Sequence, residues 1–191
     1  MSIIMLKNVT LAFPALAEAE AVGDGKPAFG ARYVIDPKDT AAVEAIEAAM
    51  RAVAKDKWKD KADDIYKMLA EDGKLAFSKK EYRSSKTGKT YDGFEGMYHV
   101  GTRSEKTKPT AVDRTGAEIT ATSEIERVFY SGCLVHAKVE FWAQDNSFGR
   151  RINATTLGVM FAGEGTRFGG GSSAASAADF AGLASEAEDF V

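Results

Sequence analysis

The chain has 191 residues, of which 45% are hydrophobic and 28% charged. This composition is typical of a globular protein with one buried core, and it excludes a chain that is disordered throughout. The formal net charge of −3 is unevenly divided, because residues 163–191 carry five acidic side chains and one basic side chain, so the other residues sum to +1. An acidic stretch of this kind often marks an interaction tail.

The sequence also predicts the compartment. Cys133 is the only cysteine, so an intrachain disulfide is excluded and a reducing compartment is expected. It lies in an apolar run and is predicted to be buried. The apolar run at residues 3–6 is short and follows no basic residue, so a secretory signal is not predicted, and no run approaches membrane-spanning length. We therefore expect a cytoplasmic protein with no membrane association.

Two strands are predicted near the N-terminus. Residues 3–13 have strand character and are followed by Pro14, which is expected to end the strand. A Gly- and Pro-rich turn at residues 23–27 leads into a second strand at residues 29–35.

A pair of helices is predicted next, as an insertion over about residues 39–71. Asp39 or Thr40 is suited to cap a helix that runs to about residue 56, because apolar residues recur at helical spacing behind it. A second helix is predicted over residues 60–71. Trp58, between the two, is predicted to be a core residue.

The second half of the chain begins with an irregular basic arm at about residues 74–114. Two apolar-rich segments, residues 127–143 and 150–161, flank a polar loop and predict a strand–loop–strand hairpin. Residues 163–191 are rich in Ala, Gly and Ser and predict a flexible tail.

This order of elements predicts a mostly β fold with a helical insertion, of the α+β class. A small closed or partly open barrel fits it better than a doubly wound sheet does. The predicted domain spans residues 1–162, and the tail follows it.

The basic arm is the main candidate for a binding surface. Residues 74–114 carry ten basic and five acidic side chains, with five aromatic residues interleaved. Cations can follow the phosphates of a single-stranded nucleic acid while aromatic rings stack on its bases. The alternative is a solvated loop whose aromatic residues turn inward, and we favour binding for the cluster as a whole. The candidate DNA-binding residues in the arm are Lys79, Lys80, Tyr82, Arg83, Lys86, Lys89, Tyr91, Phe94, Tyr98, Arg103, Lys106 and Lys108.

A second basic site is predicted at the hairpin. Arg150 and Arg151 begin the later strand, and two arginines can hold phosphate groups bidentately. They can equally pair with Glu140 or Asp145, and the sequence does not choose between these roles. Trp142 is a further candidate DNA-binding residue, as a ring on which a base can stack.

Motifs typical of catalysis are missing from the sequence. It has no phosphate-binding P-loop and no Gly-x-Ser-x-Gly nucleophile elbow. Its two histidines, His99 and His136, lack the spacing of a zinc site. We therefore expect a protein that is not an enzyme and that needs no cofactor or metal.

Two stretches of the sequence carry a family resemblance. The first is Tyr91-Asp92-Gly93-Phe94-Glu95-Gly96-Met97-Tyr98, followed by Lys108-Pro109 and Val112-Asp113. The second contains Tyr130-Ser131-Gly132-Cys133, Val139-Glu140-Phe141-Trp142-Ala143-Gln144-Asp145-Asn146, Gly149-Arg150-Arg151-Ile152-Asn153-Ala154, Leu157-Gly158-Val159-Met160-Phe161 and Gly163-Glu164. Together they resemble a family of bacteriophage single-stranded-DNA-binding proteins, over most of the chain.

The resemblance implies a five-stranded OB-fold barrel elaborated with helices and a long arm. It implies binding of single-stranded DNA without sequence preference during phage replication or recombination, in the cytoplasm of an infected bacterial host. It leaves the oligomeric state open, with a dimer among the options.

The acidic end of the chain is the predicted regulatory and partner-binding element. A flexible acidic peptide mimics nucleic-acid charge, so it can compete for a basic groove and offer its aromatic residue to another protein. We expect it to screen the DNA groove and to recruit replication or recombination proteins. The candidate tail residues are Asp179, Phe180, Glu186, Glu188, Asp189 and Phe190.

Three other interpretations stay open at this stage. A module for duplex DNA or RNA would use the same basic arm. A structural or scaffolding phage protein would use the arm as an assembly loop. A nuclease subunit is the least supported of the three.

Overall fold

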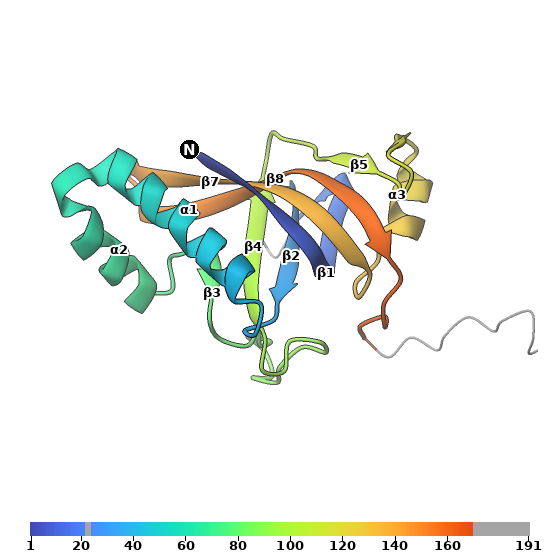
Figure 1. Cartoon of the computed structure of the whole chain (residues 1–191), viewed down its shortest axis with the longest axis horizontal. Coiled ribbons are helices and arrows are strands. Elements are labelled where there is room, and N and C mark those ends of the chain that lie inside the picture. The colour runs from blue at the N-terminus through green and yellow to red at the C-terminus, as the bar shows by residue number, and fades with distance from the viewer. Residues whose placement is uncertain (22–23, 170–191) are drawn as a thin grey trace, which may run out of the picture.

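The chain folds around one curved β-sheet in the computed structural model, which describes residues 1–21 and 24–169. Its strand order is β3-β4-β2-β1-β7-β8-β5-β6. Five long strands form the frame of this sheet (Figure 1): β1 (Ser2–Glu20), β2 (Ala28–Ile35), β4 (Tyr98–Ser104), β7 (Leu134–Asn146) and β8 (Gly149–Gly163).

The five long strands curl into a barrel of OB type. Strand β1 pairs antiparallel with both β2 and β7, and these pair in turn with β4 and β8. The two outer long strands then meet, because the Thr102 hydroxyl on β4 lies 2.8 Å from the Thr156 hydroxyl on β8. The Tyr33 hydroxyl joins them inside the barrel, 2.8 Å from Thr156. A mostly β fold with a helical insertion is therefore confirmed.

The sheet also contains three short strands besides the five long ones. They are β3 (Phe77–Ser78), β5 (Thr110–Val112) and β6 (Glu118–Ile119). The strands β3, β4 and β5 all lie within residues 74–114, which were predicted to be irregular, and β6 follows that segment. The short strands extend the sheet at both ends.

Pro14 does not end the first strand, contrary to the prediction. Strand β1 continues to Glu20, and its register with β2 shifts between Ala12 and Ala15. A proline lacks the N–H that a regular ladder needs, so it is tolerated where a bulge interrupts that ladder. Phe13, beside it, has a φ of 48°, as expected of a residue at a sharp local bend.

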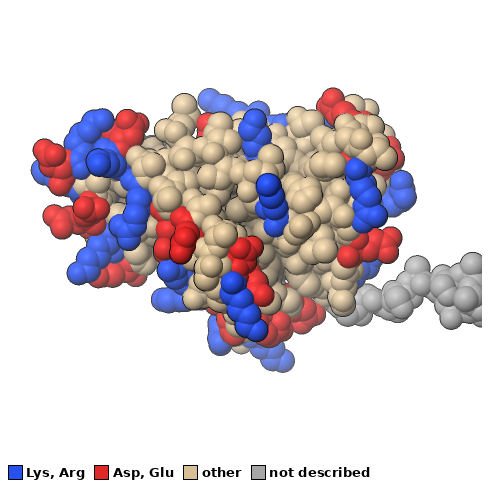
Figure 2. All heavy atoms as spheres, in the orientation of Figure 1, with Lys and Arg blue, Asp and Glu red and all other residues tan. Residues whose placement is uncertain are grey.

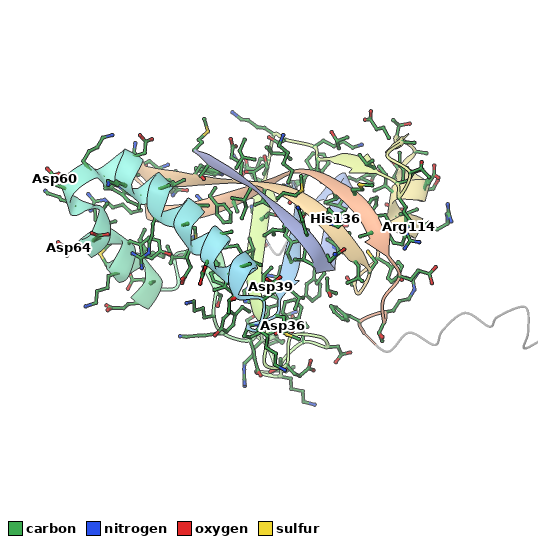
Figure 3. All side chains as sticks on the ribbon, viewed as in Figure 1. Asp36, Asp39, Asp60, Asp64, Arg114 and His136 are labelled. Carbon is green, nitrogen blue, oxygen red and sulfur yellow. The ribbon has the colours of Figure 1, made fainter. Side chains whose placement is uncertain are left out.

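The helical insertion lies close to its predicted place. It consists of α1 (Thr40–Trp58), the 3₁₀ turn η1 (Lys59–Lys61) and α2 (Ala62–Glu71). Asp39 caps α1, since its carboxylate accepts a hydrogen bond from the Ala42 N–H at 3.0 Å (Figure 3). Trp58, at the end of α1, is buried as predicted.

Strand β7 begins later than predicted. Residues 127–128 belong to a third helix, α3 (Thr122–Val128), and the strand starts only at Leu134. Gly132 lies between the two elements with a φ of 110°, a backbone conformation that favours glycine. Regular alternation of apolar residues begins only at Val135, so the apolar content of residues 127–133 was misleading.

Cys133 is fully buried, as predicted. Burial raises the pKa of its thiol to about 11. Among the described residues, no helix is long and apolar enough to span a membrane.

Candidate nucleic-acid interface

A groove of about 890 Å³ lies between the end of β4 and the β7–β8 hairpin, on the outside of the barrel. Both strands of the hairpin line the groove, with Trp142 on β7 and Arg151 on β8 among the lining residues. Residues from the end of α1 and from the chain just after α2 close its other side. The groove thus joins the barrel to the helical insertion.

The groove carries more positive than negative side chains. Its five cations are Lys57, Lys74, Arg103, Lys106 and Arg151, and its three carboxylates are Asp56, Glu105 and Glu140. Three of these cations were predicted site residues, while Lys57 and Lys74 were not. A shallow, net basic groove of this kind suits a phosphate backbone.

Two aromatic side chains face the groove. Trp142 is half-buried, and its indole N–H donates a hydrogen bond to the Thr155 hydroxyl at 3.1 Å, which fixes the plane of the ring. Phe148 lies at the tip of the hairpin and is 89% exposed. A ring held in place and a ring left in solvent can both offer a face to an unpaired base.

The arm holds a second group of aromatic residues. Tyr82 and Tyr91 stack with their ring centroids 5.0 Å apart, and Phe13 packs edge-on against Tyr91 at 5.1 Å. Phe13 is 46% exposed, so the group is open on one side. Both tyrosines were predicted site residues, whereas Phe13 was not, because its position at a bulge gives no periodic signal.

Phe94, a predicted base-contacting residue, faces the protein interior in this structure. It is fully buried, between the Tyr82 ring at 5.4 Å and the Phe168 ring at 6.2 Å. Tyr98 is half-buried against Phe77, with their ring centroids 5.9 Å apart. These two residues therefore fit the alternative interpretation of the arm, in which its aromatic side chains turn inward.

Arg32 connects the aromatic group to the groove. Its guanidinium lies 3.7 Å from the centre of the Tyr82 ring and 3.3 Å from Nδ1 of His99. Gly101, which lines the groove, leaves room for it, since a Cβ there would lie 2.9 Å from an Arg32 nitrogen. Burial, and then the charge of Arg32, lower the pKa of His99 to about 4.

The predicted cations divide into paired and unpaired ones. Four of them form ion pairs, namely Lys79 with Glu47, Arg83 with Glu81, Arg103 with Glu105, and Arg150 with Asp145. Within residues 1–21 and 24–169, the others form none; these are Lys80, Lys86, Lys89, Lys106, Lys108 and Arg151. Figure 2 shows the two signs mixed over the helical insertion and the arm.

The residues just after β8 pack on the arm and on residues 130–132. Phe168 lies so close to Gly93 that a Cβ there would clash with its ring. The Gly169 N–H donates a hydrogen bond to the Asp92 carboxylate at 3.1 Å, and the Arg167 guanidinium lies 3.8 Å from the centre of the Tyr130 ring. All the tail residues that were singled out, from Asp179 to Phe190, lie outside the described residues.

Metal chemistry finds no support in the described part of the chain, where no group of three or more His, Cys, Asp or Glu side chains could hold an ion. His136 has a structural contact instead. Its Nδ1 accepts a hydrogen bond from the Asn8 N–H at 3.1 Å, at a bend of β1.

Comparison with known proteins identifies the family. The family model described as the ssDNA-binding protein of Enterobacter phage Enc34 matches residues 1–191. The chain belongs to this family. Protein p50 of Acyrthosiphon pisum secondary endosymbiont phage 1 is 35% identical over 170 residues, which cover 88% of this chain and 87% of p50.

Solved structures agree with the family. The ssDNA-binding protein of bacteriophage Enc34, in complex with ssDNA, matches with a TM-score of 0.72 and 25% identity, over 88% of this chain and 90% of that one. The ssDNA-binding protein gp2.5 of bacteriophage T7 matches with a TM-score of 0.54 and 12% identity, over 92% of this chain and 99% of that one. The second likeness concerns the fold alone.

Proposed function

We propose that this chain binds single-stranded DNA along the groove, without sequence preference, during phage replication or recombination. The single observation that carries this proposal is the groove itself, a basic surface with Trp142 held inside it. Its long cationic side chains suit phosphates, and an aromatic face accepts any base. The known ssDNA complex of the phage Enc34 protein supports the same ligand.

The path of the strand would run from the groove onto the arm. Arg32 lies against both Gly101 of the groove and Tyr82 of the arm, so a bound strand passing Arg103 would next meet the open side of the aromatic group. Unpaired lysines along the arm would then follow the phosphates. The role is one of binding, with no catalytic step.

The tail would modulate this binding. Phe168 and Gly169 contact the arm, so the tail is tethered at the arm. A tethered acidic peptide has a high effective concentration there, and its contacts weaken as salt screens them. Bound DNA would displace the tail and leave Phe190 free for replication or recombination proteins in the host cytoplasm.

A titration of fluorescent oligo-dT with the full chain, read by anisotropy at low and high salt, tests the proposal. We expect tight binding that weakens with salt and that resists competition by duplex DNA and by single-stranded RNA. Effective competition by either nucleic acid would favour a duplex- or RNA-binding module. Absence of binding, even without the tail, would favour a scaffolding role.

A further inference from the structure

Phe148 occupies an unusual position for a large apolar side chain. It lies in the two-residue loop between the paired residues Asn146 and Gly149, and it is 89% exposed at the edge of the groove. No described residue covers it. The ring contributes little to the core, and its place at the edge of the groove leaves it free to contact a ligand there.

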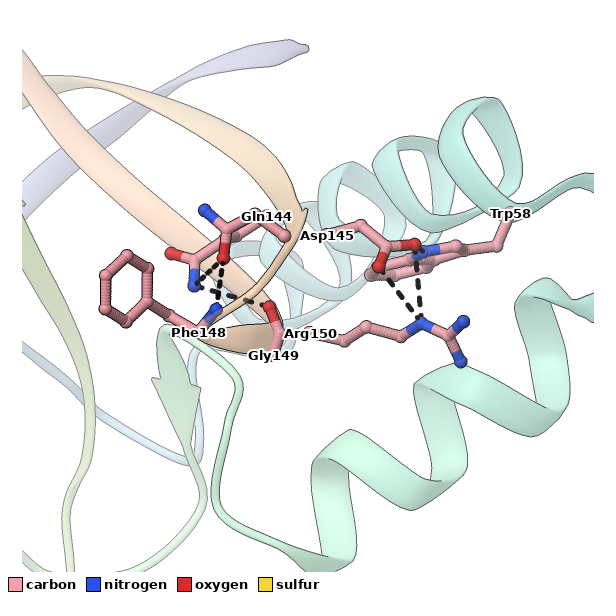
Figure 4. A network of polar contacts seen from close by, with 7 residues as sticks. Trp58, Gln144, Asp145, Phe148, Gly149 and Arg150 are labelled. Atoms are coloured by element: carbon pink, nitrogen blue, oxygen red, sulfur yellow. Dashed lines mark hydrogen bonds and ion pairs between the residues drawn. The ribbon is translucent and has the colours of Figure 1, made fainter.

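The loop that carries Phe148 is held in one shape. The Phe148 N–H donates to the Asn146 side-chain oxygen at 3.0 Å. The Gln144 side-chain amide donates to the same oxygen at 3.3 Å and to the Gly149 carbonyl at 3.4 Å (Figure 4). These contacts fix the backbone from which the phenyl ring projects.

The end of the hairpin has little support from the barrel itself. The pairing of β7 with β1 ends at Phe141, and beyond it the hairpin pairs with another segment only at Ile152, within the described residues, through a bridge to Leu75. An isolated two-stranded hairpin is marginally stable in water. A ribbon that forms one wall of a binding groove therefore needs a second support.

The helical insertion supplies that support. The Trp58 indole N–H, at the end of α1, donates to the Asp145 carboxylate at 2.8 Å, and Arg150 Nε lies 3.3 Å from each carboxylate oxygen. Figure 4 shows this network beside the loop of Phe148. The bond from Trp58, followed by Arg150, holds the pKa of Asp145 below its usual range. A backbone bond from Ile152 N–H to the Lys74 carbonyl, 3.1 Å long, ties the other strand to the chain after α2.

We propose that Phe148 is a base-contacting residue and that Trp58 is the positioning residue that holds its hairpin against the groove. This inference rests on the proposed ssDNA function and adds a role for the helical insertion. Trp58 is buried and does not line the groove, so it acts on DNA only through Asp145.

A double-mutant cycle on ssDNA affinity tests the coupling. Phe148→Ala should weaken oligo-dT binding by about tenfold, the loss expected for one stacked base. Trp58→Phe removes the indole N–H and should weaken binding by about threefold, with the salt dependence unchanged because no phosphate contact is lost. In the Trp58→Phe background, the effect of Phe148→Ala should shrink to about threefold or less.

Asp145→Ala removes the acceptor of the same hydrogen bond. It can replace Trp58→Phe in the test if that variant fails to fold. Loss of a negative charge near the groove would tighten DNA binding if simple electrostatics decided the result. Loss of positioning predicts weaker binding instead. Tighter binding by Asp145→Ala would overturn the proposal.

Tyr66→Phe is the matched control, because it removes a polar atom from a buried aromatic residue of the same insertion. Within the described residues, the Tyr66 hydroxyl makes no hydrogen bond to the hairpin. It should leave affinity unchanged. Hydrogen exchange should quicken at residues 145–150 in Trp58→Phe and not in the control. If the wild-type chain binds oligo-dT but the effects of Phe148→Ala and Trp58→Phe on affinity are additive, only the proposed positioning role of Trp58 is refuted. A wild-type chain that fails to bind oligo-dT would refute the proposed function as well.

Discussion

His99 is a neutral histidine in the folded protein, and this makes stability depend on pH. Its folded pKa of about 4 lies below the ordinary 6.5, so the unfolded chain takes up a proton at higher pH than the folded chain does. Stability is therefore lost as pH falls from about 6.5 towards about 4. Denaturant unfolding should give a free energy about 2 kcal/mol lower at pH 5 than at pH 7. His99→Asn should remove most of this difference; an unchanged difference would contradict the burial of a neutral ring.

Alanine variants of Phe94 and Trp142 should differ in effect, the first lowering stability and the second weakening DNA binding. Phe94→Ala empties a fully buried position and should lower the free energy of unfolding by about 3 to 5 kcal/mol. Trp142→Ala should mainly weaken oligo-dT binding, by about 1 to 3 kcal/mol for one base. Chemical denaturation and anisotropy on both variants check this. Normal stability of Phe94→Ala would show that its ring is free to act elsewhere.

At the residue scale, the sequence predicted which residue types form the site better than it predicted where each one lies. Arg151 and Trp142 of the hairpin line the groove, while Phe94, a candidate from the arm, is buried. Cation and aromatic content are visible in a sequence. The direction of a side chain in an irregular arm depends on distant partners such as Phe168, and no local pattern records them.

The segment after β8 is held to the arm by one aromatic contact in particular. Gly93 has a φ of 81° and lies under the Phe168 ring, so this turn of the arm and the start of the tail share a single packing site. Phe168→Ala should quicken hydrogen exchange at residues 91–94 and 165–169. Phe148→Ala, a phenyl deletion at the hairpin tip, should leave those amides unchanged. Equal exchange in wild type and Phe168→Ala would show that the contact does not hold the segment.

Regular elements were the most predictable part of the fold. The first helix could be predicted because its apolar stripe recurs every three to four residues, and the β7–β8 hairpin because alternation holds from Val135 onward. The passage of β1 through Pro14 could not, since it depends on a bulge that only strand pairing reveals. The short strands of the arm are likewise set by their neighbours in the sheet.

The whole molecule combines a nearly neutral body with an acidic end, and this predicts the effect of removing the tail. A chain lacking residues 172–191 should bind oligo-dT more tightly at low salt, and the gain should shrink as salt screens the acidic residues. Replacing Glu186, Glu188 and Asp189 by their amides, with Phe190 kept, should give a similar gain. Anisotropy titrations at two salt concentrations measure both. Unchanged or weaker affinity would contradict autoinhibition by the tail.

The helical insertion was predictable as a pair of helices, but its contact with the β7–β8 hairpin was not. Trp58 was expected to be a core residue and is one, yet its indole N–H reaches a hairpin strand that lies 87 residues further along the chain. Long-range contacts of this kind follow from the closed barrel and leave no trace in local periodicity.

The salt dependence of oligo-dT affinity in Arg151→Ala, compared with Arg127→Ala, tests the placement of DNA in the groove most directly. Both variants lose one exposed arginine, but only Arg151 lines the groove, while Arg127 lies on α3. We predict that Arg151→Ala weakens binding and reduces the slope of log K against log salt by about 0.7, the loss of one phosphate contact. Arg127→Ala should leave both unchanged. Equal effects of the two variants would contradict binding in this groove.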